Sequence, residues 1–114
     1  MSNLQSHGRK YKGYKIVHAT ERDDEVLSIA DHSFTIKLQK AYRCFPGAGL
    51  FLGLTKQYCL DYFSIAGEEG ALPELLLTYE FREKDVINGD PTYQNGEVQV
   101  RWAKYLAKEK VEGK

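Results

Sequence analysis

Six residues, spread over three stretches of this chain, are of types that could bind a sugar and a flat heterocycle and act on the glycosidic bond between them. They are His18 and Thr20, then Gly49, Phe51 and Tyr62, and finally Glu97. An imidazole can donate a hydrogen bond to a sugar hydroxyl, and aromatic rings stack on a flat heterocycle. An ionised carboxylate stabilises the positive charge that develops on a sugar as its glycosidic bond breaks. These residue types raise the hypothesis of a site that breaks such a bond.

Strands and helices must bring these residues together, and the hydrophobic pattern predicts both. Alternating or continuous apolar residues predict strands over 14–18, 34–38, 50–54, 75–81 and 98–101. Thr20, followed by several acidic residues, predicts a capped helix over about 21–31. Thr55 predicts the cap of a second helix that ends near Gly67, and a short third helix is expected around Tyr105. The order of elements predicts an α+β fold, with a mixed or antiparallel split β-sheet and two to three short helices.

Length and composition fit a single domain with no membrane anchor. Of the 114 residues, 1–10 have almost nothing to bury and predict a flexible basic tail, so the domain is expected over 11–110. Sixteen Lys and Arg residues balance sixteen Asp and Glu residues, which argues against a nucleic-acid coat protein. The cysteines, Cys44 and Cys59, are too few for a disulfide framework, and the His and Cys spacings predict no metal site. With no apolar run near membrane-spanning length, we expect a cytoplasmic protein.

The three stretches together resemble the ADP-ribosyltransferases, in particular the His-Tyr-Glu branch that includes poly(ADP-ribose) polymerases and diphtheria toxin. The sequence His-Ala-Thr at 18–20 is similar to the family's His-Gly-Ser or His-Gly-Thr, with Ala in place of Gly. Gly-Ala-Gly-Leu-Phe-Leu at 47–52, followed by a predicted helix with Tyr62, is similar to the family's strand, helix and stacking tyrosine. Phe51 stands where the family usually has its motif tyrosine. The resemblance runs from about residue 16 to residue 106.

This resemblance implies an NAD-dependent mono-ADP-ribosyltransferase and a role for each residue. His18, with Thr20 beside it, would hold the ribose nearest the adenine, and Gly49 would let the backbone approach the nicotinamide amide. Phe51 and Tyr62 would hold the nicotinamide ring, and Glu97 would be the catalytic carboxylate. NAD would be consumed as a substrate, no metal would be required, and the acceptor would be a protein or a nucleic acid. The small size is common among toxins and phage effectors.

Two other functions fit the same sequence. Residues 9–15 alternate basic side chains with tyrosines, which predicts a nucleic-acid-binding module whose cations contact phosphates and whose rings stack on bases. The second alternative is a degenerate ADP-ribosyltransferase fold that binds a protein partner and performs no chemistry, because Phe51 lacks the hydroxyl of the motif tyrosine. Phe51 and Tyr62 can also be interpreted as residues of the hydrophobic core. His18 and Glu97 can also be interpreted as polar residues with a structural role only.

Overall fold

The fold is built almost entirely from antiparallel β-strands. The computed structural model describes residues 9–28, 35–65, 68–70, 73–93 and 95–111. Its strands are β1 (Lys10–Ala19), β2 (Glu25–Ser28), β3 (Thr35–Lys37), β4 (Tyr42–Cys44), β5 (Leu50–Gly53), β6 (Glu74–Arg82), β7 (Val86–Asn88), β8 (Glu97–Val100) and β9 (Trp102–Lys110). A helix, α2 (Lys56–Tyr62), lies between β5 and β6, and a 3₁₀ turn, η1 (Glu83–Asp85), joins β6 to β7.

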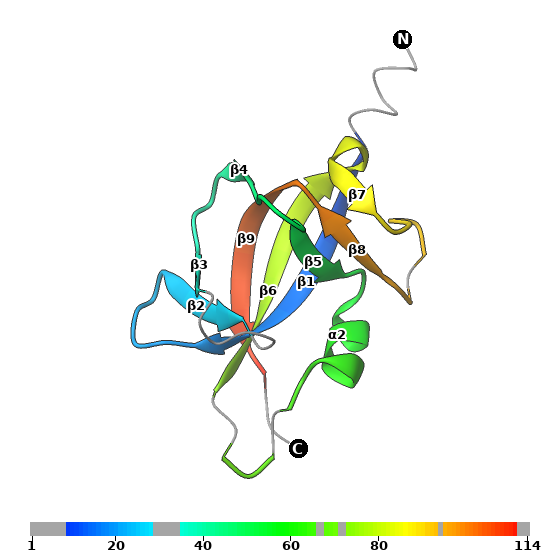
Figure 1. The fold of residues 1–114 in the computed structure, drawn as a ribbon. Coiled ribbons are helices and arrows are strands. Elements are labelled where there is room, and N and C mark those ends of the chain that lie inside the picture. The colour runs from blue at the N-terminus through cyan, green and yellow to red at the C-terminus, as the bar shows by residue number, and fades with distance from the viewer. Residues whose placement is uncertain (1–8, 29–34, 66–67, 71–72, 94, 112–114) are drawn as a thin grey trace.

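The strands form one sheet in the order β4-β9-β6-β1-β5-β8-β7, and the β2-β3 hairpin branches from β1. Figure 1 shows the long strands β9, β6 and β1 side by side. β1 and β6 pair from Lys10 opposite Arg82 to His18 opposite Glu74. By contrast, β1 and β5 have one paired position among the described residues, Tyr14 opposite Gly53. The sheet is therefore tight on one side of β1 and loosely joined on the other.

The hydrophobic core lies on the inner face of this sheet. Its members alternate along each strand with outward-facing residues, as expected for strands with one buried face. The main cluster takes side chains from eight strands, β1 to β6, β8 and β9, or from the residues beside them, and includes Val17, Leu52, Phe81, Val98 and Tyr105. The ring of Tyr11 extends the core by stacking on Phe81, with ring centroids 5.7 Å apart. These strands therefore hold one another in place through a shared interior.

The helix α2, which the sequence predicts, packs on the opposite, outer face of the sheet. Thr55 caps it by accepting a hydrogen bond from the backbone N–H of Tyr58 at 3.0 Å. Cys59 is fully buried against Ile16 of β1 and Leu76 of β6. Its thiol also donates to the backbone carbonyl of Tyr14 at 3.2 Å. The helix ends at Tyr62, with Phe63 as its C-cap, so the predicted end near Gly67 is about five residues too late.

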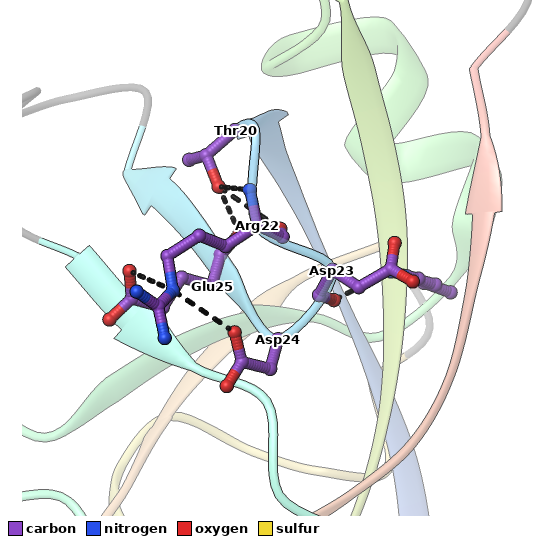
Figure 2. A network of polar contacts seen from close by, with 6 residues as sticks. Thr20, Arg22, Asp23, Asp24 and Glu25 are labelled. Atoms are coloured by element: carbon purple, nitrogen blue, oxygen red, sulfur yellow. Dashed lines mark hydrogen bonds and ion pairs between the residues drawn. The ribbon is translucent and has the colours of Figure 1, made fainter.

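The sequence prediction of an α+β fold with two to three helices is wrong, because α2 is the one α-helix in the described part of the chain. Residues 25–28 of the predicted helix form β2, and its last three residues lie outside the described ranges. The hydroxyl of Thr20 accepts from the Arg22 N–H at 3.1 Å and donates to the Glu25 carbonyl at 2.8 Å (Figure 2). A threonine in this position builds a turn as readily as it caps a helix. Pairing of β2 with β1 and burial of Val26 then favour the strand.

The expected helix around Tyr105 is also wrong, since β9 occupies residues 102–110. Its alanine and leucine residues favour a helix locally, but the backbone hydrogen bonds to β6 and β4 override that preference. The edge strand β4 (Tyr42–Cys44) has no counterpart among the strands predicted from the sequence. The predicted strands at 14–18, 50–54, 75–81 and 98–101 are confirmed within one residue at every boundary except the start of β1, which lies four residues earlier. The predicted strand at 34–38 is β3, and its first residue lies outside the described ranges. Of the predicted 1–10 tail, residues 1–8 lie outside the described part, and Lys10 already begins β1.

Candidate functional site

A cleft opens where β1 and β5 separate beyond their single pair. Its volume is about 460 Å³, which lies in the range of small-molecule sites in proteins. Tyr14, Lys15 and Ile16 of β1 line one side, and the β5 strand with Glu97 lines the other. The cleft brings together residues that are more than eighty positions apart in the chain.

Three of the six residues singled out by sequence, Gly49, Phe51 and Glu97, line this cleft. In the β5-β8 ladder Gly53 lies opposite Glu97 and Phe51 opposite Gln99. Directly opposed residues share a face of the sheet, so Phe51 and Glu97 both project from the outer face. Phe51 is 42% exposed, which is unusual for a phenylalanine and leaves its ring available to a ligand.

Gly49 occupies a position that only glycine fits. Its φ of +82° lies in the left-handed region, and a Cβ there would stand 2.5 Å from the carbonyl oxygen of Val100. The same Cβ would lie 2.8 Å from the side chain of Ile87. The residue therefore brings its backbone close to β8 and leaves this wall of the cleft without a side chain.

Lys15 is a cleft residue that the sequence interpretation missed. Its ammonium group donates to the backbone carbonyl of Phe51 at 3.4 Å. Burial lowers the pKa of Lys15, and the neighbouring Cys59 and Glu97 oppose that shift. A single lysine within a strand carries no sequence signal of this kind, because only the separation of β1 from β5 makes room for it.

Phe63, rather than Tyr62, lines the cleft from the end of α2. The ring of Tyr62 is 71% exposed and lies against Tyr58, with centroids 4.8 Å apart. Successive helical residues point about 100° apart, so a change of one position moves a ring from the cleft to the surface. The spacing to the helix was informative, but it did not distinguish these two neighbouring aromatic residues.

His18 lies away from the cleft lining and is 1% exposed. In the β1-β6 ladder it stands opposite Glu74, which is also buried. The Glu74 carboxylate accepts from the Ser64 hydroxyl at 2.6 Å and from the Ile65 N–H at 2.8 Å. Glu74 therefore ties the segment after α2 to the sheet.

Thr20 belongs to a polar turn between β1 and β2 rather than to the cleft. Figure 2 shows its hydroxyl within the turn, beside Arg22, whose Nε lies 3.5 Å from a carboxylate oxygen of Asp24 and of Glu25. From β9, the Lys108 ammonium group donates to the Asp23 carbonyl at 2.8 Å. The hydrogen bonds of the Thr20 hydroxyl therefore lie within this turn and explain why a threonine stands there without a ligand contact.

Comparisons with known proteins leave the site to be interpreted from its own geometry. No protein-family model, curated protein or solved structure matches this chain. Over the described ranges, no three His, Cys, Asp or Glu side chains converge in a way that could hold a metal ion. Nor does that part of the chain contain a helix with the length and apolar character needed to cross a membrane.

Proposed function

We propose that this chain is an NAD-dependent mono-ADP-ribosyltransferase and that its reaction takes place in the cleft between β1 and β5. The observation that carries the proposal is the meeting of Gly49, Phe51 and Glu97 around one cavity. These residues belong to two of the three stretches that resemble the family. A ring-stacking side chain and a carboxylate at one cavity match the needs of breaking the bond between nicotinamide and ribose.

The side chains of the cleft divide the reaction between them. Phe51 stacks on the nicotinamide ring, and Phe63 supplies an additional apolar wall. As the bond from ribose C1′ to the nicotinamide nitrogen breaks, its electron pair leaves with nicotinamide and positive charge grows on the ribose. The Glu97 carboxylate stabilises that charge until a nucleophile on the acceptor forms the new bond to C1′ and loses its proton.

In this proposal three residues have roles that differ from those that the resemblance implies. His18 is buried beside β6, so in this arrangement it supports the sheet and does not reach a ligand in the cleft. Thr20 builds the turn, and Phe63 takes the place expected for Tyr62. Lys15 adds a cation inside the cleft, where it can meet a phosphate of the dinucleotide.

Release of nicotinamide from NAD, measured by chromatography, tests the proposal directly. We expect Glu97→Gln to lower the rate about 100-fold or more, as removal of a transition-state electrostatic partner does. Glu68→Gln, which changes an exposed carboxylate outside the cleft, is the matched control and should leave the rate unchanged. Phe51→Ala should raise KM for NAD, while Phe51→Tyr should preserve it because the ring face remains.

Transfer to an acceptor is measured with NAD labelled on its adenylate phosphate, in a cell lysate that is then divided between protease and nuclease digestion. Label that depends on Glu97 supports the transferase, and its digestion pattern identifies protein or nucleic acid as acceptor. Nicotinamide release or transfer that is equal in wild type and Glu97→Gln would overturn the role of this carboxylate. Absence of both activities from the wild type would favour a non-catalytic binding domain.

A further inference from the structure

The outer face of the long strands is covered by α2 along only part of its length. The helix packs over Ile16 and Leu76, toward one end of β1 and β6. Toward the other end the outward-facing side chains include four exposed ones, Lys10 and Lys12 of β1, Tyr42 of β4 and Trp102 of β9. They also include two half-buried cations, Arg82 of β6 and Lys104 of β9. We call these six residues the aromatic-basic face.

The strand register places these side chains on one continuous surface. Lys104 lies opposite Tyr42 on one side and opposite Glu80 on the other, and Glu80 in turn lies opposite Lys12. Opposed residues share a face, so this row crosses four strands, a width of about 14 Å at the usual strand spacing. Glu80 is the one carboxylate in the row and forms an ion pair with Lys10 at 3.7 Å. With Arg82 the surface keeps an excess of positive charge in a chain whose net charge is zero.

The aromatic residues of this face are held flat and exposed. The rings of Tyr42 and Trp102 stack with centroids 5.3 Å apart and an interplanar angle of 21°, although each is about 40% exposed, at 39% and 40%. The Arg82 guanidinium lies over the Tyr42 ring, 5.4 Å from its centroid. The Tyr42 hydroxyl donates to the buried carboxylate of Asp85, which anchors the ring from below. The pair is thus a preorganised stacking platform.

We propose that the aromatic-basic face binds a single-stranded nucleic acid. A base stacks on the Tyr42–Trp102 pair, while Lys10, Lys12, Arg82 and Lys104 contact phosphates along the row. Stacking on exposed rings within a cationic surface is how proteins bind single strands without base-specific hydrogen bonds. A protein partner fits less well, because interface cores are depleted in lysine and this face offers no aliphatic cluster around its aromatic pair.

The chain contains its own probe of this contact, since Trp102 is its only tryptophan. We expect the fluorescence of Trp102 to be quenched when an unlabelled oligothymidylate or oligouridylate of about twenty nucleotides is added at low salt. Anisotropy of the same oligonucleotides carrying fluorescein gives the affinity, and the two probes distinguish DNA from RNA. Four phosphate contacts predict that log K falls with log salt with a slope of about −2.8.

Variants locate the binding on this face. Trp102→Ala should weaken binding about tenfold or more, and Lys12→Ala should reduce the salt slope by about 0.7. The matched controls are Tyr93→Ala, which removes another exposed ring, and Lys37→Ala, which removes an exposed cation on β3. Both should bind as the wild type does. Circular dichroism establishes that each variant is folded, and Lys12→Ala tests the face even if Trp102→Ala does not fold.

Several results would overturn the proposal. They are absence of binding at low salt, unchanged affinity in both Trp102→Ala and Lys12→Ala, and concentration-dependent dimerisation that Trp102→Ala abolishes, which would assign the face to a second copy of the chain. Because Glu97 lies on β8 in the cleft, Glu97→Gln should bind oligonucleotides normally. This outcome separates failure of the binding surface from failure of the proposed enzyme.

Discussion

Replacing Gly53 with alanine should push α2 away from the sheet, and the structure gives the size of the effect. A Cβ at residue 53 would lie 2.5 Å from the Cys59 sulfur and 3.0 Å from a ring carbon of Tyr58. Ordinary contacts between such atoms are about 3.5–4.0 Å, so the helix must move by about 1 Å. Overpacking of a closed core costs about 1–3 kcal/mol. At about 4 °C per kcal/mol for a domain of this size, Gly53→Ala should lower Tm by about 4–12 °C.

A double-mutant cycle distinguishes crowding from any general effect of the substitution. Cys59→Ala removes the sulfur that the new methyl group would meet, so Gly53→Ala should cost about 1–2 kcal/mol less in that background. The measurement is urea unfolding of the wild type, both single variants and the double variant. Equal costs of Gly53→Ala in the two backgrounds would refute the close packing of α2 on β5. The backbone itself is no obstacle, because Gly53 does not lie in the left-handed region.

Three further predictions concern the core, the Tyr42 hydroxyl and the turn at Thr20. Phe81→Ala removes a fully buried ring and should destabilise the protein by about 3–5 kcal/mol, measured by denaturant unfolding. Burial, then the hydrogen bond to Asp85, raises the pKa of Tyr42 to about 12, so the folded state holds this proton more tightly than the unfolded state. That stabilisation is present below pH 10 and is lost toward pH 12, and Tyr42→Phe should flatten the alkaline decline in Tm. Thr20→Val should cost about 1–2 kcal/mol through its turn hydrogen bonds and leave KM for NAD unchanged, whereas a rise in KM would return Thr20 to the ligand site.

The strand predictions succeeded where the sequence alternates and failed where pairing partners decide. The alternation of Val98 and Val100 with polar residues is itself the pattern of a half-buried strand. The segment around Tyr105 contains good helix formers. It forms β9 because its backbone pairs with β6 over most of the length of that strand. The acidic residues that follow Thr20 are typical of the first turn of a helix. In the structure, however, the Thr20 hydroxyl closes a turn by donating to the Glu25 carbonyl. Local sequence does not record which neighbour will supply the backbone hydrogen bonds.

The candidate site shows the same limit at the level of single residues. Gly49, Phe51 and Glu97 could be proposed from sequence through the family resemblance, and the pairing of β5 with β8 is what brings them to one cleft. Lys15 could not, because its place in the cleft depends on the one-residue pairing of β1 with β5. The spacing of His18 was consistent with a ligand contact. In the structure, however, its side chain is buried opposite Glu74 and does not line the cleft.

The two proposed functions depend on different residues but meet at Tyr14. Its ring lines the cleft, and it also borders a second hollow shared with Lys12 of the aromatic-basic face. A single-stranded nucleic acid bound along Lys104 and Lys12 would therefore pass close to the cleft that contains Glu97. If both proposals hold, Lys12→Ala should lower transfer of label to an oligonucleotide while leaving nicotinamide release to water unchanged. An equal loss of both activities would show instead that Lys12 acts on the cleft itself, and the nucleic acid would no longer be required as acceptor.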